Sequence, residues 1–308
     1  MKIRLGYACV PVTILETSSH TITYSNYKKL GSRGIIKLGE IINNNFSSLE
    51  KILKYNIRNN INFFRMTSEL LPLLTHPSVN YNMGKYKNDF KRIGNIIKNN
   101  NLRVDIHPSA YTVLNSINEN VVSLTINILK NYQKMYKYMK IDSHIILHVG
   151  SKVGGKKEGM KRFIKNFYKL PNEVQKLIVL ENDDKSYNIR NVLSICEKIK
   201  IPMVLDYHHF KVNKNNEKIE DYIEKIFNTW DKTPKIHFSS PKDKKNIRAH
   251  NDYIDSDDFI DFLNKVKFTN RDFDVMIEAK KKDEALFRLV RELKYKTNYK
   301  IEDTTIFL

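Results

Sequence analysis

A carboxylate and two imidazoles follow a short apolar run near the middle of the chain. Residues 203–205 read Met-Val-Leu, which is typical of a strand that is buried on both faces. Asp206 follows at once, and His208 and His209 come shortly after. An unpaired carboxylate is costly to bury, whereas carboxylates and imidazoles are common ligands of divalent metal ions. Taken alone, the stretch fits either a metal site or a strand that ends in a solvated loop.

Metal-competent residues recur at or just beyond the ends of other short apolar segments, and this recurrence favours the metal site. Without a bound cation, so many such residues on one rim would repel one another or stay poorly solvated. His144 begins its segment and is expected at the opposite end of the molecule, while His208 neighbours His209, so neither is assigned to the site. The predicted ligands are His76, His107, His148, Glu181, Asp206, His209, His237, His250 and Glu278.

Eight apolar segments that alternate with helical patterns would position these residues. The predicted strands span residues 3–9, 61–67, 102–107, 145–150, 177–180, 203–205, 235–238 and 275–278. This alternation predicts a single (β/α)8 TIM barrel over residues 1–308, with its active site at the C-terminal ends of the strands. We expect a polar loop up to about residue 37, a helix from about residue 47 and a short tail from about residue 297 that fits no element of the barrel.

The number of candidate ligands indicates more than one metal ion. One ion takes about four ligands, so the predicted set would suit two or three ions that share carboxylates. Neighbouring divalent ions are common in phosphodiester cleavage, because one activates a water while the others neutralise charge on the phosphoryl oxygens and the leaving group. The constellation therefore predicts a metal-dependent nuclease.

The charge balance supports a nucleic-acid partner. Lys and Arg number 53 against 34 Asp and Glu, which gives a formal net charge of +19. This excess favours a polyanionic partner, although an AT-rich codon bias would also enrich lysine. No apolar run approaches the roughly 20 residues of a membrane span, and no signal peptide is recognisable. With only Cys9 and Cys196, we expect no disulfide framework and an intracellular protein, in the cytoplasm or nucleoid, the nucleus or a virus-infected cell, and not secreted. We also expect a monomer.

Several segments, in matching order, resemble motifs of the UV damage endonucleases. They are His-Pro-Ser-Ala-Tyr at 107–111, Leu-Glu-Asn-Asp-Asp at 180–184, Leu-Asp-Tyr-His-His at 205–209, Lys-Ile-His-Phe-Ser-Ser at 235–240 and Asp-Val-Met-Ile-Glu-Ala-Lys at 274–280. The resemblance spans about residues 2–295. It implies a barrel related to endonuclease IV, usually supplied with Mn²⁺. It also implies cleavage of DNA immediately 5′ to pyrimidine dimers and (6-4) photoproducts, which leaves a 3′-hydroxyl.

The resemblance implies roles for individual residues as well. The nine candidate ligands are also those that the matching motifs carry over, and Glu181 would bridge two ions. Glu181, Glu278 and Lys235 would be catalytic. In the family the lysine that corresponds to Lys235 is carboxylated, which turns a cation into a carbamate ligand. An unmodified Lys235 could instead hold a phosphate.

Three residues are implied in DNA contact. Tyr7 and Tyr111 match aromatic residues that enter the duplex, where they can stack on unpaired bases. Ala110 stands where the family has Gln, so the polar half of this wedge is missing, and Val10 and Pro11 replace the expected Asn after the first strand. Either tyrosine could instead be a core aromatic.

Three other functions fit part of the pattern. An endonuclease of the endonuclease IV type would use similar metals on abasic sites. A sugar isomerase shares the barrel and its metals but needs neither the charge of +19 nor a tyrosine wedge. A basic DNA-binding protein without catalysis would leave the ligands without a role.

Overall fold

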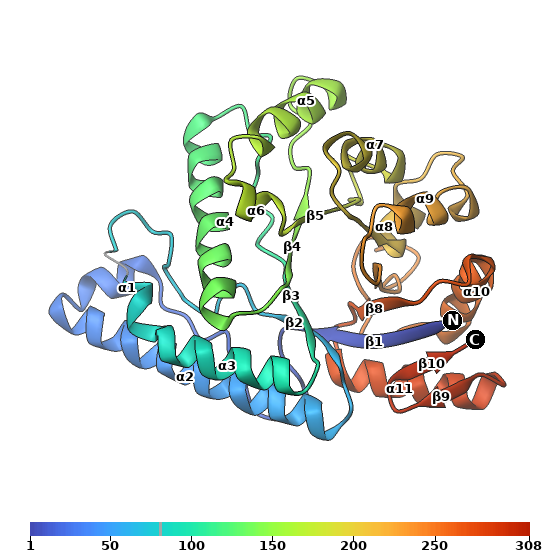
Figure 1. Ribbon diagram of the computed structural model, residues 1–308, viewed down its shortest axis with the longest axis horizontal. Helices are drawn as coiled ribbons and strands as arrows, with labels where there is room; N and C mark the ends of the chain where they lie inside the picture. The colour runs from blue at the N-terminus through green and yellow to red at the C-terminus, as the bar shows by residue number, and fades with distance from the viewer. Residues whose placement is uncertain (80–81) are drawn as a thin grey trace.

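Eight parallel strands close into a barrel. The computed structural model (Figure 1) describes residues 1–79 and 82–308. Each strand pairs in parallel with the next, and β1 pairs with both β2 and β8, so the sheet closes on itself. The predicted (β/α)8 TIM barrel is therefore confirmed. The strands are β1 (Lys2–Ala8), β2 (Phe63–Met66), β3 (Arg103–Ile106), β4 (His144–His148), β5 (Ile178–Glu181), β6 (Met203–Asp206), β7 (Lys235–Phe238) and β8 (Phe273–Ile277).

Helices connect the strands along the outside of the barrel. The longer ones are α2 (Ser32–Arg58), α3 (Lys87–Asn99), α4 (Glu119–Met139), α5 (Lys156–Phe167), α7 (Ile189–Ile199), α10 (Ser256–Val266) and α11 (Lys282–Lys296). The shorter ones are α1 (Tyr24–Lys29), α6 (Asn172–Gln175), α8 (Tyr207–Val212), α9 (Ile223–Asn228), and the 3-10 turns η1 (Met83–Tyr86), η2 (Ile219–Asp221) and η3 (Lys267–Thr269). None of the helices in the described part of the chain combines the length and the apolar character that a bilayer span requires.

Helix α2 begins well before the point that the sequence pattern indicated. Leu38, Ile42, Phe46 and Leu49 are buried along one side of it, at the three- and four-residue spacing of an amphipathic helix. The asparagines at 43–45 interrupt this stripe and make the segment read as polar. The expectation of a polar loop up to about residue 37 is therefore wrong, because α1 and the start of α2 lie within it.

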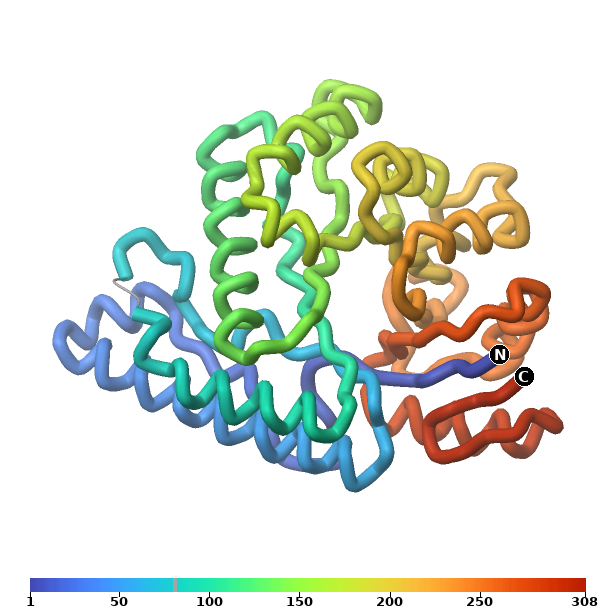
Figure 2. The backbone as a smooth tube through the Cα atoms, in the orientation of Figure 1, coloured from blue at the N-terminus to red at the C-terminus, as the bar shows by residue number. Residues whose placement is uncertain are grey.

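The C-terminal tail is part of the sheet. It forms a hairpin of β9 (Lys300–Glu302) and β10 (Thr305–Phe307), and β10 pairs antiparallel with the first residues of β1. Ile306 is fully buried beneath it. The Met1 amino group donates to the Leu308 carbonyl at 2.9 Å, and the two chain ends lie together in Figure 2. The tail that fitted no predicted element thus extends the barrel beside β1.

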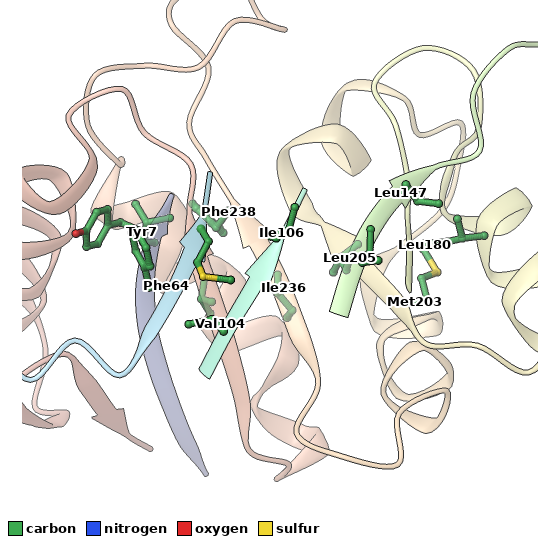
Figure 3. Packing of buried hydrophobic residues seen from close by; sticks show 14 of the residues in the cluster. Tyr7, Phe64, Val104, Ile106, Leu147, Leu180, Met203, Leu205, Ile236 and Phe238 are labelled. Atoms are coloured by element: carbon green, nitrogen blue, oxygen red, sulfur yellow. The ribbon is translucent and has the colours of Figure 1, made fainter. Parts of the chain in front are cut away.

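Alternation along the strands separates an apolar layer from the barrel interior. Phe64, Ile106, Leu180, Leu205 and Ile236 lie in the buried apolar cluster shown in Figure 3, which includes the inner sides of the helices. Successive side chains of a strand point to opposite faces. The next residue in each case therefore points into the barrel or onto its rim; these residues are Arg65, His107, Glu181, Asp206 and His237.

Candidate metal centre

Glu181 lies at the centre of the site, at the C-terminal end of β5, and is 1% exposed. Its Oε2 lies 3.0 Å from His107 Nε2 and 3.9 Å from His148 Nε2. Its Oε1 lies 3.0 Å from His237 Nδ1 and 3.5 Å from His209 Nδ1. Burial alone would raise the pKa of this carboxyl group, but the imidazoles around it hold the pKa well below its ordinary value. Glu181 is therefore an ionised carboxylate with ligand-type nitrogens facing both oxygens.

Seven of the nine predicted ligands come together in three groups. Within each group the ligand-type atoms lie within 4.8 Å of one another. Glu181 and Asp206 each belong to two groups, so each could bridge neighbouring ions. Mixed carboxylate and imidazole donors suit first-row divalent metals. The groups are His107, His148 and Glu181; Glu181, Asp206 and His209; and Asp206, His237 and Glu278.

A short helix that the sequence pattern did not reveal places His209 beside Asp206. Helix α8 begins directly after β6, and the Asp206 carboxylate caps it by accepting the backbone N–H of His209 at 2.6 Å. This turn leaves His209 Nδ1 3.5 Å from Asp206 Oδ2, a buried oxygen that has no hydrogen-bond partner among the described residues. Burial raises the pKa of Asp206 well above its ordinary value. A cation at this point would satisfy the orphaned oxygen.

Three histidines are oriented by backbone carbonyls. A carbonyl only accepts, so each ring carries a proton on Nδ1, and in the neutral ring the lone pair lies on Nε2, as in many metal-binding histidines. At His107 this lone pair faces Glu181 Oε2 at 3.0 Å, and a cation between the two acceptors would satisfy both. The donor set therefore fits divalent metal ions. The Nδ1 to carbonyl distances are 2.8–3.0 Å, for His107 to Pro108, His209 to Asn182 and His250 to Glu278.

His250 lies beside the site although it belongs to none of the three groups. Its Nδ1–H bond to the Glu278 carbonyl and an isolated β-bridge with Pro241 return the loop after β7 to the barrel. Its ring centroid lies 6.3 Å from that of His209. The bond at Nδ1 thus leaves Nε2 of His250 as the nitrogen that could bind a metal ion, as in His107 and His209.

His76 is not brought to the other ligands, against the prediction. Its ring stacks on Tyr24 with the centroids 3.7 Å apart, and its Nδ1 accepts the backbone N–H of Ser78. Strand β2 ends at Met66, so a series of turns separates His76 from the strand. The ligands that do converge lie in a strand or within three residues of its end, where the barrel fixes their direction.

His144 lies at the end of the barrel where the sequence placed it, and His208 lies outside the three ligand groups. His144 is at the start of β4, at the end of the barrel opposite the ligands, with its ring against Trp230. Burial is the main cause that lowers its pKa to about 3. His208 is 1% exposed and packs edge-on against His250. Neither belongs to a ligand group within the described residues.

A layer of buried charged side chains lies below the ligands, and two of them were not predicted from the sequence. Lys235 Nζ lies 2.5 Å from Asp105 Oδ2, and Arg65 Nε lies 3.4 Å from Asp105 Oδ1. All three side chains are almost fully buried. Burial lowers the pKa of Lys235 to about 8, against the opposing effect of Asp105. The sequence did offer a sign of Arg65 and Asp105, because each is a charged residue inside an otherwise apolar strand.

Tyr7 is a core residue. It is 0% exposed, its hydroxyl donates to Asn56 Oδ1 on α2 at 2.7 Å, and its ring centroid lies 5.1 Å from that of Phe64. Gly6 and Ala8 take the inward positions of β1, so Tyr7 points outward to the helices. A buried ring in this position does not reach a DNA base. The predicted DNA contact of Tyr7 is therefore wrong.

Tyr111 is 89% exposed, in the loop between β3 and α4. Ala110 beside it is also exposed. This loop leaves the barrel at the end that carries the metal ligands, directly after His107 and Pro108. An aromatic ring is thus presented to solvent near the cluster.

The comparisons with known proteins agree with this geometry. Residues 3–306 match the family model of UV-endonuclease UvdE. The UV DNA damage endonuclease of Bacillus cereus (strain B4264) is 38% identical over 301 residues, which cover 95% of both chains. That of Bacillus thuringiensis subsp. konkukian (strain 97-27) has the same identity and coverage. The crystal structure of SacUVDE matches with a TM-score of 0.87 and 33% identity, over 95% of this chain and 98% of that chain.

More distant barrels share only the fold. A D-tagatose 3-epimerase-like protein is 15% identical with a TM-score of 0.61, over 95% of this chain and 96% of that chain. Identity at this level carries no information on the reaction. The family model, by contrast, matches nearly the whole length of the chain. The chain therefore belongs to the UV-endonuclease UvdE family.

Proposed function

We propose that this chain repairs DNA by cleaving the backbone immediately 5′ to pyrimidine dimers and (6-4) photoproducts, with a water activated by metal ions. The observation that carries the proposal is the cluster of carboxylates and imidazoles around Glu181 in a member of the UV-endonuclease family. Sugar isomerisation is not favoured, since the epimerase-like barrels share the fold alone. Abasic-site cleavage is not favoured, since the family model and the 38% identical relatives are UV endonucleases.

The side chains of the cluster would hold two or three divalent ions, for which we propose Mn²⁺. Such ions supply an activated water and neutralise charge on the phosphate. Glu181 and Asp206 would set the spacing by serving two groups each. The carbonyl-bound Nδ1–H groups of His107, His209 and His250 keep the rings in place for this task. We expect the chain to act as a monomer.

Glu278 is placed to meet the substrate. Its side chain is 14% exposed, whereas those of Glu181 and Asp206 are 1% and 0% exposed. We therefore assign to Glu278 the acceptance of a proton from the attacking water. Lys235 is 0% exposed and cannot hold a phosphate of the substrate, so any catalytic effect of Lys235 acts through the residues that it contacts.

DNA binding would combine charge with base stacking. The net charge of +19 suits contact with phosphates. Tyr111 would fill the gap left by a flipped lesion, and Ala110 would add little volume beside it. This assignment rests on the exposure of Tyr111 and on its place at the ligand end of the barrel.

A nicking assay tests the proposed function. UV-irradiated supercoiled plasmid is incubated with Mn²⁺ and the full chain, with and without a chelator. We expect relaxation of the irradiated plasmid only, and its loss with the chelator, because the cluster needs its ions to activate water. Abasic plasmid serves as the comparison substrate. Preferential cutting of abasic DNA, or cutting that resists the chelator, would contradict the proposal.

Carboxylation of Lys235 is a further part of the proposal. A carbamate would place a negative charge near Arg65 and Arg103, whose positive charges already bear on the pKa of Lys235. Asp105, now paired with the ammonium, would have to release it. We expect native mass spectrometry in mildly alkaline bicarbonate buffer to show the added mass of one CO₂ on the metal-loaded protein. The variant Lys235→Arg should not gain this mass, and an unmodified metal-loaded wild-type chain would exclude the carbamate.

A further inference from the structure

A guanidinium lies among the ligands of the third group. Arg65 reaches into the barrel from β2 and is 6% exposed. Its Nη1 donates to Glu278 Oε1 at 2.5 Å, and its Nη2 lies 2.6 Å from His237 Nε2. Within the described residues it makes no hydrogen bond or ion pair to the group of His107. Two of the three members of the third group are thus already engaged with a cation.

The contact between Arg65 and His237 differs from those of the other oriented histidines. His107, His209 and His250 face carbonyl oxygens, which accept a proton and leave Nε2 free. A guanidinium only donates, so His237 Nε2 must accept, and its proton must lie on Nδ1. Nδ1 of His237 faces Glu181 Oε1 at 3.0 Å, so the nitrogen that remains for a metal ion is the one that Arg65 contacts.

Neither mode of metal binding at His237 is compatible with this contact. An ion on Nδ1 would leave the proton on Nε2, and two donors would face each other across 2.6 Å. An ion on Nε2 would occupy the place of the guanidinium itself. In both cases Arg65 has to move before His237 can act as a ligand.

We propose that Arg65 occupies the third metal position in the metal-free protein and competes with the ion that binds Asp206, His237 and Glu278. This inference rests on the proposed metal-dependent function and specifies how its site fills. Without metal, the guanidinium offsets the negative charge of buried carboxylates, which are costly to leave unpaired. An incoming ion must displace it, so the ions bind in order, and the third position fills last and most weakly.

The structure also offers a place for the displaced guanidinium. Arg65 Nε already lies 3.4 Å from Asp105 Oδ1, below the ligands and toward the barrel interior. A small shift in that direction would retain a charged partner for Arg65 while it releases His237 and Glu278. Asp105 keeps its other oxygen on Lys235 throughout.

Metal titration of the full chain without DNA tests the competition. The protein is stripped with a chelator and titrated with Mn²⁺, and the free ion is followed by electron paramagnetic resonance. For Arg65→Met, which keeps the bulk but loses the charge and the donors, we expect the last ion to bind at least about tenfold more tightly than in the wild type. The metal-induced rise in Tm should also be larger, because the metal-free variant has no guanidinium beside the carboxylates of the third group.

Arg103→Met is the matched control, because Arg103 lies on the adjacent strand and pairs with Asp274 instead of a ligand. We expect it to leave the affinity for the last ion unchanged. If Arg65→Met does not fold, Arg65→Lys serves in its place, since one ammonium cannot reach both Glu278 and His237 in the same way, and severalfold tighter binding is expected. Unchanged or weaker binding of the last ion in the folded variants would overturn the competition.

Different experiments test the competition between Arg65 and the metal ion and the proposed function, so one proposal can be refuted without the other. The titration reports on metal binding alone, whereas the nicking assay reports on cleavage of irradiated plasmid. A wild-type chain that binds Mn²⁺ in order but never cuts would refute the nuclease and leave the role of Arg65 intact. A chain that cuts, and whose Arg65 variants bind the last ion no more tightly, would do the reverse.

Discussion

Glu181→Gln is expected to reduce incision of UV-damaged DNA by at least about a thousandfold, because activation by metal ions is worth several kcal/mol and each ~1.4 kcal/mol is a factor of ten. Both oxygens of Glu181 face imidazole nitrogens, and the residue belongs to two of the three ligand groups. An amide offers one acceptor oxygen and no negative charge, so the shared ligand is lost. Single-turnover incision and duplex affinity should be measured on the same preparation.

Duplex affinity should change little in Glu181→Gln, since binding comes mainly from Lys and Arg contacts with phosphates. Glu217→Gln is the control. Glu217 is also buried, at 5% exposed, but its carboxylate binds Asn188 and the backbone N–H of Asn215, away from the ligands. Near-normal cleavage by Glu181→Gln would remove the metal-nuclease proposal.

Tyr111→Ala is expected to lower the preference for damaged over undamaged duplex by roughly 5- to 100-fold. This range follows because stacking on a base contributes ~1–3 kcal/mol and ~1.4 kcal/mol is a factor of ten. Tyr111 is almost fully exposed, so its loss should not affect the core. The measurement is the ratio of dissociation constants for matched duplexes with and without a pyrimidine dimer.

Tyr295→Ala provides the matched control for Tyr111→Ala. Tyr295 is 92% exposed near the end of α11, at the opposite end of the barrel from the ligands. Its removal should leave the affinity ratio unchanged. If Tyr111→Ala gives the same ratio as Tyr295→Ala, Tyr111 does not recognise damage. Ala110→Gln should be tolerated, since Ala110 is exposed as well.

The barrel and most of its ligands could be predicted because both depend on local patterns. Short apolar runs at regular intervals predict strands, and a barrel fixes the direction of any residue at a strand end. Glu181, Asp206 and His237 lie within strands, and the structure brings all three together. For such residues the position in sequence nearly determines the position in space.

The same local patterns could not predict where loop residues lie or which face of a strand points into the barrel. His76 and His250 both lie in loops far from their strands. His250 returns to the site through its hydrogen bond to the Glu278 carbonyl and its β-bridge with Pro241, which the sequence does not reveal. Tyr7 was assigned to the wrong environment although the strand alternates: Ile3, Leu5 and Tyr7 share one face, and Lys2 and Arg4 lie on the other. Gly6 and Ala8 fall on the same face as Lys2 and Arg4, and Ala8 packs inside the barrel against Phe63 and Met276, which places Tyr7 on the outer face toward the helices.

The placement of the C-terminal hairpin has a consequence for how the chain folds. Strand β1 is synthesised well before its partners β8 and β10, which begin at residues 273 and 305. Until β8 emerges, one edge of β1 stays unpaired, and until β10 emerges the first residues of the other edge do too. An unpaired strand edge invites pairing with another chain. Contacts between residues this far apart in sequence also slow folding. The barrel can therefore close only after β8 has been synthesised, and a product that ends before β8 would leave an edge of β1 open to pairing with another chain.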